Sequence, residues 1–366
     1  MKLAILGTRG IPARYGGFET FAEEIAIRLV EAGHEVTVYC ELHPDTEELP
    51  TYKGVDLVYI KTPKLGPLST IWFDLKCLVH ARSNFNIVYM LGYGASVFCF
   101  IPRLWGTPVW VNMDGIEWAR TKYNLLGKTW CLMMETFSMF TASRMICDAE
   151  AIYHHINRRQ PFTPAHSVIE YGAPIIDDDL QTDVLEHYGV KAREYYLVVC
   201  RMEPENHVLE ILEGFAASDA KYPLIVLGNI DMETDYVEKL KQVNDPKVRL
   251  VGTMYDQKKL QHLRRESLAY FHGHSVGGTN PSLIEALGCG NVVVAHDNEF
   301  NREVAGEKAF YFEKQEQIPA IVDKVENDQT LDLESYRQAA RNRIKERYTW
   351  EIITKKYIDL INVYKK

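Results

Sequence analysis

An alternation of short apolar runs and amphipathic segments extends along the whole chain. Apolar runs typical of buried strands lie at Leu3–Leu6, Val36–Cys40, Val55–Ile60, Ile87–Leu91 and Val109–Asn112. A second series lies at Tyr195–Cys200, Leu224–Leu227, Val248–Val251, Ala269–Phe271 and Val292–Ala295. The clearest helix, Phe18 to Ala32, has an apolar side and a charged side and ends at Gly33. This order predicts an α/β fold with two tandem, doubly wound, parallel Rossmann-like sheets.

The length of 366 residues also predicts two domains, because one ordinary core does not grow to that size. A proline and an acidic run, Pro174 to Asp179, interrupt the alternation. We therefore expect an N-terminal domain over residues 1–175 and a C-terminal domain over 176–348. Residues 332–364 indicate helices that are broken around Tyr348-Thr349-Trp350, and the last one, within 349–366, is expected to pack back toward the N-terminal domain.

Composition and charge exclude several classes of protein. The net charge of −9 and the lack of a Lys/Arg-rich tract argue against a nucleic-acid partner. The seven cysteines form no C-x-x-C pair, which disfavours a zinc site or disulfide framework and favours a reducing cytoplasm. The opening MKLAIL is too short for a secretory signal, and no apolar stretch approaches the roughly 20 residues of a membrane span.

A glycine-rich loop, GTRGIPARYGGFET (residues 7–20), follows the first strand. It lacks the Walker Lys-Ser/Thr ending and the G-x-G-x-x-G spacing of dinucleotide sites. Gly16 and Gly17 stand just ahead of a helix, where free backbone N–H groups and the helix dipole favour an anion. Ligands of open α/β sheets bind at this edge, but a tight turn without a ligand explains the glycines equally well.

The second series contains a matching loop, HGHSVGGTNPSLIE (residues 272–285). Asn280 is a good N-cap and Pro281 fits the first helical position, so the amides around Gly278, Thr279 and Ser282 are expected to form a second anion site. Arg201 follows the first strand of this series, and its forked donors suit a diphosphate. Together these features predict a site for a molecule that carries phosphates and a sugar, with both glycine loops facing one cleft.

Four stretches carry a resemblance to a known family: residues 7–20, 112–118 (NMDGIEW), 201–206 (RMEPEN) and 277–285 (GGTNPSLIE). In these the chain resembles the GT-B retaining glycosyltransferases of glycosyltransferase family 4, and in particular the rhamnosyltransferase branch whose N-terminal domain was formerly of unknown function. Tyr348-Thr349-Trp350 and the closing helix are also similar to that family's C-terminal end.

The resemblance implies that Arg201, Asn206, His274 and Glu285 contact the donor, together with Gly16, Gly17, Gly278, Thr279, Asn280 and Ser282. Three positions depart from the wider family. Asn206 stands where a lysine is usual, Gly277 replaces the first of two glutamates, and Asp114 replaces a histidine. The first two changes are similar to the rhamnosyltransferase branch.

A diphosphate leaving group needs its developing charge stabilised, and Arg201 with the two helix starts can supply this without a metal. Asp177-Asp178-Asp179 lies at the expected domain junction rather than in a loop after a strand. We therefore expect no metal and no cofactor other than the nucleotide-sugar substrate.

The acceptor hydroxyl needs a carboxylate to orient or deprotonate it. Asp114 and Glu117 follow a strand, so Asp114 is the first candidate for the catalytic carboxylate and Glu117 the second, and Arg14, Tyr15 and Arg120 are further candidate acceptor contacts. The family resemblance implies a front-face route in which the donor phosphate takes the proton. The alternative is that Asp114-Gly115 is only a turn and that Glu117 and Arg120 form a solvated pair.

The region from Lys61 to Arg144 holds nine Lys/Arg against four Asp/Glu in a chain that is acidic overall. Trp72, Phe73, Trp105 and Trp110 are mixed with them, a composition that suits contact with an anionic membrane but also ordinary core aromatics. His154, His155 and His272 lack the spacing of a metal site.

The sequence therefore predicts a glycosyltransferase that moves L-rhamnose from dTDP-rhamnose to a saccharide or lipid-linked saccharide in bacterial surface polysaccharide synthesis. It would work in the cytoplasm, with peripheral membrane contact as one possibility. The sugar and nucleotide rest on the resemblance. A UDP- or GDP-sugar donor, a sugar-nucleotide epimerase and a non-catalytic nucleotide-sugar binding module remain open.

Overall fold

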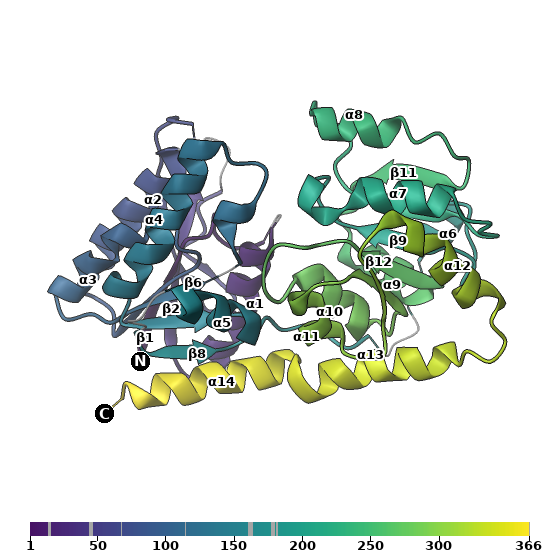
Figure 1. Ribbon diagram of the computed structural model, residues 1–366. Helices are drawn as coiled ribbons and strands as arrows, with labels where there is room; N and C mark the ends of the chain where they lie inside the picture. Colours follow the sequence, from purple (N-terminus) through teal and green to yellow (C-terminus); the bar gives the residue numbers. More distant parts are fainter. Residues whose placement is uncertain are drawn as a thin grey trace. The chain divides into compact units, whose positions relative to one another are not determined.

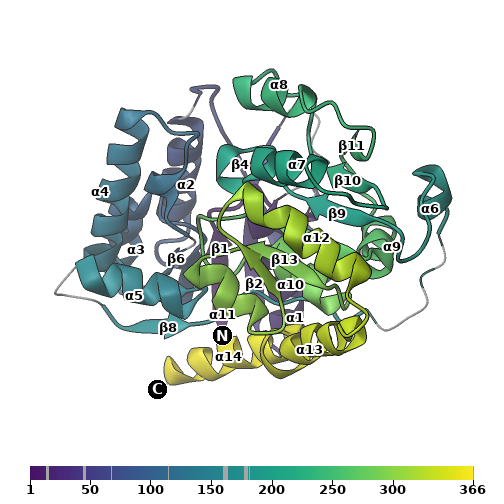
Figure 2. The same ribbon diagram turned by 45° about the vertical axis from the view of Figure 1, so that its right-hand side comes forward.

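The computed structural model describes residues 1–13, 16–43, 47–66, 68–113, 115–159, 164–176, 180 and 182–365. The chain forms two compact units (Figures 1 and 2). The N-terminal unit comprises Met1–Gly172 with Trp350–Lys366, and the C-terminal unit comprises Ala173–Thr349.

The N-terminal unit is built on an eight-stranded sheet of order β3-β4-β2-β1-β5-β6-β7-β8. Its pairings are parallel except that β3 runs antiparallel to β4. The central strands are buried, as expected for a parallel sheet covered on both faces. The strands are β1 (Lys2–Leu6), β2 (Glu35–Leu42), β3 (Thr51–Tyr52), β4 (Val55–Lys61), β5 (Ile87–Met90), β6 (Val109–Met113), β7 (Arg144–Cys147) and β8 (His166–Val168).

Helices cover both faces of this sheet. The chain moves one way along the sheet from β1 to β2 and the other way from β4 through β5, β6 and β7 to β8. Because crossovers are right-handed, α1 lies on one face and α2 to α5 lie on the other. The helices are α1 (Gly17–Glu31), α2 (Leu68–His80), α3 (Phe100–Leu104), α4 (Leu125–Thr141) and α5 (Glu150–Arg159), with 3₁₀ turns η1 (Ser96–Cys99) and η2 (Glu117–Ala119).

The last helix, α14 (Trp350–Val363), packs on α1 within the N-terminal unit. The ring of Phe21 on α1 lies 6.3 Å from Trp350 and 5.9 Å from Tyr357. The Tyr357 hydroxyl bonds the Tyr89 hydroxyl on β5 at 2.8 Å, and Asn112 Nδ2 donates to the same Tyr89 oxygen at 2.9 Å. The final helix is therefore part of this unit's core.

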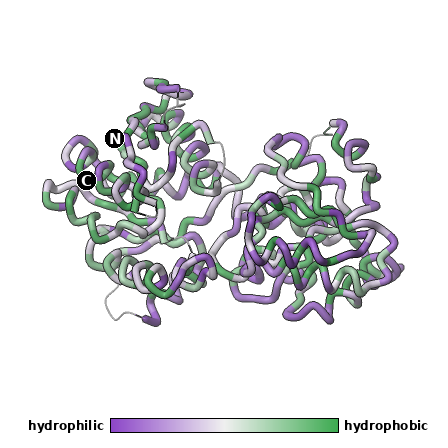
Figure 3. Tube along the Cα trace, turned by 90° about the horizontal axis from the view of Figure 1, so that it is seen from above, coloured by the Kyte–Doolittle hydropathy of each residue, from purple (hydrophilic) through white to green (hydrophobic). Residues whose placement is uncertain are grey.

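The C-terminal unit is a six-stranded parallel sheet of order β11-β10-β9-β12-β13-β14. Its strands are β9 (Tyr196–Val199), β10 (Leu224–Leu227), β11 (Val248–Gly252), β12 (Ala269–His272), β13 (Val293–His296) and β14 (Phe310–Phe312). Its helices are α6 (Val184–His187), α7 (Val208–Ala216), α8 (Asp235–Lys241), α9 (Gln257–Glu266), α10 (Pro281–Gly288), α11 (Glu299–Ala305), α12 (Ile318–Asn327) and α13 (Leu333–Arg347), with η3 (Pro204–Asn206) and η4 (Gln315–Gln317). Figure 3 shows hydrophilic residues along much of this unit's outer chain.

All ten strands predicted from apolar runs are present, and α1 begins and ends within a residue of its predicted bounds. The predicted break around Tyr348-Thr349-Trp350 separates α13 from α14. The strands β3, β7, β8 and β14 were not predicted; each is only two to four residues long, and three of them, β3, β8 and β14, are edge strands.

We predict that Trp350→Ala lowers the free energy of unfolding of the N-terminal unit by about 3–5 kcal/mol, the usual cost of truncating a large buried aromatic side chain. Trp350 is 6% exposed, and its ring fills the space above Gly172 and beneath the guanidinium of Arg28. Urea unfolding measures the change. Lys355→Ala, at an exposed position of the same helix, serves as control and is expected to stay within about 0.5 kcal/mol of the parent. Equal effects of the two changes would contradict the core role of α14.

Candidate active site

The loops after β9 and β12 carry the polar groups of the C-terminal unit. The chain leaves β9 toward β10 on one side, whereas β12 lies on the other side of β9. Strand order therefore reverses between β9 and β12, and ligands of open α/β sheets bind outside the carboxyl ends of the strands at such a point. Residues 200–207 and 273–280 are the two loops that begin there.

These two loops are bonded to each other. His274 Nδ1 lies 2.6 Å from Asn206 Oδ1, and His207 Nδ1 lies 2.8 Å from the carbonyl oxygen of Gly273. The Ser275 amide donates to the carbonyl oxygen of Glu205 at 2.9 Å. A Cβ at Gly273 would lie 2.0 Å from the Asn206 carbonyl oxygen, so only glycine allows this approach. The two loops therefore form one rigid platform.

Arg201 is the accessible cation of this platform. Its side chain is 45% exposed, and its Nη1 lies 3.6 Å from Glu203 Oε1, a long contact. Asn206, in contrast, is buried, and its Nδ2 donates to the Arg201 carbonyl oxygen at 2.7 Å. The amide of Asn206 thus fixes the backbone of Arg201 and the ring of His274 and leaves the guanidinium free to meet an anion.

The start of α10 is capped as the sequence predicted. Asn280 Oδ1 accepts from the Ser282 amide at 3.0 Å and from the Ser282 hydroxyl at 2.9 Å. The Asn280 carbonyl oxygen accepts from the amides of Leu283 and Ile284. Because the cap already uses the Ser282 amide, the buried residues Gly278 and Thr279, just before the cap, are the nearer candidates for contact with a ligand.

Glu285, one turn into α10, is held by an arginine that the sequence analysis did not single out. Arg264 Nη1 on α9 lies 2.6 Å from Glu285 Oε2, and the Arg264 side chain is 2% exposed against 28% for Glu285. The pair fixes one carboxylate oxygen and leaves the side chain partly accessible. No spacing signal could reveal Arg264, because the fold alone brings α9 to α10.

Two neutral histidines lie beneath the platform. Burial lowers the pKa of His272 to about 3, with Arg264 and His296 contributing. Burial, with His207 contributing, lowers the pKa of His296 to about 4. The rings of His207 and His296 stack with their centroids 4.0 Å apart. The imidazole of His272 is uncharged at neutral pH, and its Nε2 is buried without a partner in the described chain.

In the N-terminal unit, strand order reverses between β1 and β5, and the glycine loop begins there. Gly7 has φ +80°, and a Cβ on it would lie 2.1 Å from the carbonyl oxygen of Leu91, which follows β5. Gly16 has φ +118° and caps α1. The conformation of both glycines explains their presence without any ligand.

Two carboxylates of α1 occupy the inner side of this loop. Glu19 Oε1 accepts from the Arg9 amide at 3.1 Å and from the Thr8 hydroxyl at 3.3 Å, and Glu23 Oε2 accepts from the Ala13 amide at 2.7 Å. Glu19 lies so close to Gly16 that a Cβ there would meet its Oε2 at 2.1 Å. The anion favoured by the start of α1 is thus already supplied by the chain, although the sequence analysis gave Glu19 no role.

Glu117 is an ion-paired carboxylate. Its Oε1 lies 2.6 Å from Arg120 Nε, and its Oε2 lies 3.5 Å from Lys122 Nζ and accepts from the Tyr123 hydroxyl at 3.2 Å. Arg120 is buried rather than part of a solvated pair. These contacts hold the carboxylate of Glu117 in one position, which suits it to orient a hydroxyl. The other candidates, Arg14, Tyr15, Asp114 and Asp177 to Asp179, lie outside the described residues.

Over the described ranges, no group of three or more His, Cys, Asp and Glu side chains has the arrangement of a metal site. Over the same ranges, no helix has both the length and the apolar character to span a bilayer.

Two family models match the chain, one in each half. Residues 1–174 match a family model described as a domain of unknown function, DUF1972. Residues 186–347 match the model described as glycosyl transferases group 1. No curated protein sequence matches the chain.

Three solved structures are similar over nearly the whole chain. Alr3699/HepE of Anabaena, in complex with UDP and glucose, is 16% identical with a TM-score of 0.79, covering 99% of this chain and 100% of that one. Sucrose-phosphate synthase (tll1590) from Thermosynechococcus elongatus is 15% identical with a TM-score of 0.82 over 99% and 98%. A glycosyltransferase from Rickettsia africae is 14% identical with a TM-score of 0.76 over 100% and 98%.

These likenesses show the fold, which is the GT-B fold with two Rossmann-like domains, as the sequence predicted. Residues 186–347 are similar to the glycosyl transferases group 1, and residues 1–174 are similar to the DUF1972 domain.

We predict that His272 makes the folded state sensitive to mild acid. The unfolded chain takes up a proton at this position near pH 6.5, whereas the folded chain does so only near pH 3, so unfolding becomes easier as pH falls between these values. The loss is roughly 2 kcal/mol at pH 5. In urea unfolding at pH 7 and pH 5, His272→Asn is expected to show a smaller difference between the two pH values than the parent. Exposed His154→Asn serves as control, and an unchanged difference in His272→Asn would contradict the assignment.

Proposed function

We propose that the protein is a retaining glycosyltransferase that moves a sugar from a nucleotide diphosphate to a saccharide acceptor. The observation that carries this proposal is the accessible Arg201 on the rigid platform of the C-terminal unit, in a domain of the glycosyl transferases group 1 type. The proposed donor is dTDP-L-rhamnose, which rests on the resemblance to the rhamnosyltransferase branch of family 4.

In the C-terminal unit we assign the donor. The Arg201 guanidinium meets the diphosphate and stabilises the charge that develops on the leaving group. The backbone at Gly278 and Thr279 lies beside the positive end of α10 and binds the same phosphates. Glu285, held by Arg264, accepts hydrogen bonds from sugar hydroxyls with the oxygen that the ion pair leaves accessible. Asn206, His274, Asn280 and Ser282 keep these groups in position.

In the N-terminal unit we assign the acceptor. Asp114 is the proposed catalytic carboxylate, and Glu117, fixed by Arg120, orients the acceptor with Arg14 and Tyr15. Gly16 and Gly17 contact the sugar of the donor rather than its phosphates, because the adjacent carboxylate of Glu19 repels a second anion and accepts hydrogen bonds from hydroxyls. The donor phosphate itself receives the proton of the attacking hydroxyl in the proposed front-face route.

The proposed place of action is the cytoplasm, supported by seven free cysteines of which six are buried. The product would contribute to a bacterial surface polysaccharide. The acceptor is a saccharide, free or lipid-linked, and a lipid-linked acceptor would bring the N-terminal unit to a membrane. Transfer without a metal ion is part of the proposal.

A UDP-sugar is the second candidate donor, favoured by the UDP and UDP-glucose complexes of the similar Anabaena protein. A GDP-sugar, an epimerase and a binding module are outcomes that the same experiments separate. Interconversion of a nucleotide sugar without acceptor indicates the epimerase, and binding without turnover indicates the module.

We predict that dTDP-rhamnose raises the melting temperature of the protein more than UDP-glucose or GDP-mannose, because a ligand that binds only the folded state stabilises it by mass action. The gain is about 2.7 kcal/mol at a hundredfold excess over the dissociation constant. Thermal-shift measurements with each nucleotide sugar check this. A larger shift with a UDP-sugar would contradict dTDP-rhamnose as the donor but would remain consistent with a glycosyltransferase.

We predict that Arg201→Ala lowers kcat of transfer by roughly 10²–10³-fold, the usual effect of losing one donor to a developing negative charge. Release of nucleotide diphosphate in the presence of acceptor measures the rate, with and without EDTA. Exposed Arg249→Ala on β11 is the control and should keep the parent rate. An Arg201→Ala protein with full activity would remove Arg201 from the mechanism, and activity lost in EDTA and restored by one divalent ion would overturn metal independence.

A further inference from the structure

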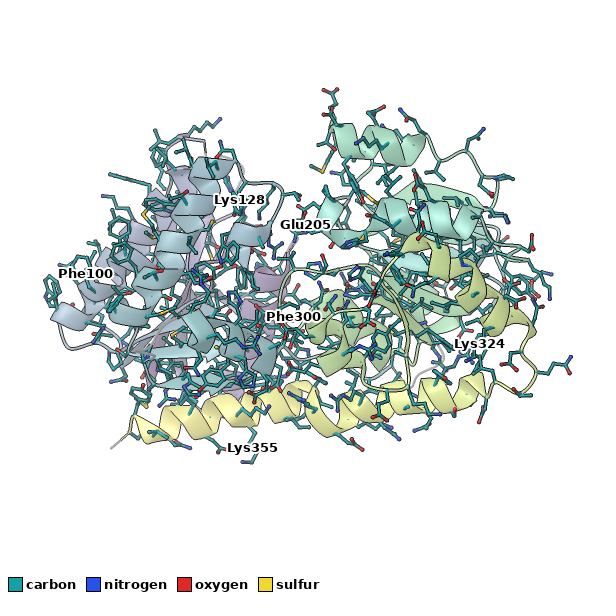
Figure 4. All side chains as sticks on the ribbon, in the orientation of Figure 1. Phe100, Lys128, Glu205, Phe300, Lys324 and Lys355 are labelled. Carbon is teal, nitrogen blue, oxygen red and sulfur yellow. The ribbon has the colours of Figure 1, made fainter. Side chains whose placement is uncertain are left out.

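The helices α2, α3 and α4 lie on one face of the N-terminal sheet (Figure 1). Each of them carries exposed apolar side chains. On α2 the exposed apolar residues Leu68, Trp72 and Val79 recur at intervals of four and seven. On α4, Leu126, Met133, Phe137 and Phe140 recur at intervals of seven, four and three, so each set lies on one stripe of its helix. Figure 4 shows Phe100 projecting from α3 at the outer edge of the unit. The exposed members are Leu68 (60%), Trp72 (40%), Val79 (36%), Phe100 (44%), Leu104 (72%), Leu125 (80%), Leu126 (80%), Met133 (43%), Phe137 (41%) and Phe140 (62%), with Leu65 (49%) and Trp105 (56%) beside them. We call this set the α2–α4 face.

The helices that form the α2–α4 face show only positive charge to solvent. Their two acidic residues, Asp74 and Glu135, are 4% and 1% exposed. Glu135 is ion-paired with Arg159, and burial raises the pKa of Asp74 to about 8, so its carboxyl is largely uncharged at neutral pH. Lys76 and Arg103 are exposed, and Lys128 is half-buried on α4 (Figure 4).

The tryptophans of the α2–α4 face are paired with cations. Lys76 Nζ lies 5.2 Å from the ring centre of Trp72, and the Arg82 guanidinium lies 5.4 Å from that of Trp105. An aromatic ring with a long basic side chain beside it suits the boundary between lipid tails and headgroups, because the ring enters the apolar layer and the cation remains in water.

Hydrogen bonds fix α4 to α3 and to the segment that precedes α3. Arg103 Nη1 donates to the carbonyl oxygen of Phe140 at 2.8 Å, and the Thr141 hydroxyl donates to that of Ser96 at 2.8 Å. Trp130 Nε1 donates to the carbonyl oxygen of Gly94 at 3.0 Å. The exposed side chains therefore stand on an ordered layer, and they are not the result of a loosely packed core.

The charge pattern distinguishes two possible partners of this face. In a symmetric contact between two copies, the same face meets itself, and lysines and arginines would oppose lysines and arginines without a carboxylate between them. An anionic lipid surface offers an apolar interior for the leucines and phenylalanines together with phosphates for the cations.

We propose that the α2–α4 face docks on an anionic phospholipid bilayer. Docking would bring the N-terminal unit to a lipid-linked acceptor, and in this respect the proposal rests on the proposed function.

The test is co-sedimentation with phosphatidylcholine vesicles that do or do not contain about 30% phosphatidylglycerol, a fraction that gives a strongly negative surface. The whole chain is expected to bind the anionic vesicles at least about tenfold more tightly than the neutral ones and to lose affinity as salt rises. Wild-type protein that stays in the supernatant with anionic vesicles at low salt would overturn the proposal.

Two variants with matched controls test the apolar and the electrostatic contributions to vesicle binding. The triple variant combines Leu104→Ser, Leu126→Ser and Phe140→Ser. It should weaken vesicle binding at least about tenfold, because it removes apolar area that inserts into the bilayer. The control combines Met232→Ser and Tyr255→Ser, two exposed positions of the C-terminal unit, and should not weaken binding. Lys76→Glu with Lys128→Glu should weaken binding to anionic vesicles at least about tenfold, whereas Lys239→Glu with Lys258→Glu, an equal change in net charge, should not. Unchanged binding by the triple variant would overturn the docking surface.

Two further measurements separate the alternatives. Sedimentation equilibrium that shows a dimer in the parent and a monomer in the triple variant would assign the face to a second copy and overturn the proposal. A thermal shift with nucleotide sugars, measured on the same proteins, tests the proposed function by itself. Variants that lose vesicle binding but keep the thermal shift support the proposal. A thermal shift that is missing in every protein, the wild type included, counts against the proposed transferase function alone.

Discussion

In each unit, a close backbone contact that only a glycine permits joins the loops proposed to bind substrate. In the N-terminal unit Gly7, just after β1, meets the carbonyl oxygen of Leu91, and in the C-terminal unit Gly273, just after β12, meets that of Asn206. Both contacts lie where strand order reverses. Each therefore joins the loops that follow two adjacent strands and lead to opposite sides of the sheet. A side chain at either position would separate the loops and with them the groups proposed to bind substrate.

The two loop systems differ in the charge they present. The C-terminal unit offers the accessible guanidinium of Arg201 and the start of α10. In the N-terminal unit, in contrast, the carboxylates of Glu19 and Glu23 accept hydrogen bonds from backbone amides of the glycine loop. An anionic group is therefore better accommodated by the C-terminal unit and a neutral, hydroxylated one by the glycine loop. This electrostatic difference supports the assignment of phosphates to one unit and sugar hydroxyls to the other.

Ion pairs in which one partner is buried recur as positioning devices. Arg264 fixes Glu285, Arg159 with Trp118 fixes Glu135, and Arg120 with Lys122 fixes Glu117. The Glu135 pair has a second consequence, since it withdraws a negative charge from α4 and leaves the outer side of that helix apolar and basic. The interior electrostatics of the N-terminal unit thus decide the character of its surface.

The sequence by itself determined the two parallel sheets, the course of α1, the cap of α10 and the break before α14, because apolar periodicity and capping chemistry are local. It also placed Arg201 and Asn280 at the ends of strands and helices, where side chains meet ligands. Only the tertiary structure decided that Asn206 holds the loops together, that Glu19 fills the start of α1, that Arg264 fixes Glu285 and that Asp74 and Glu135 turn inward. These contacts join residues that the chain separates by up to 68 positions, or depend on which side of a helix faces the sheet, and no local pattern encodes either.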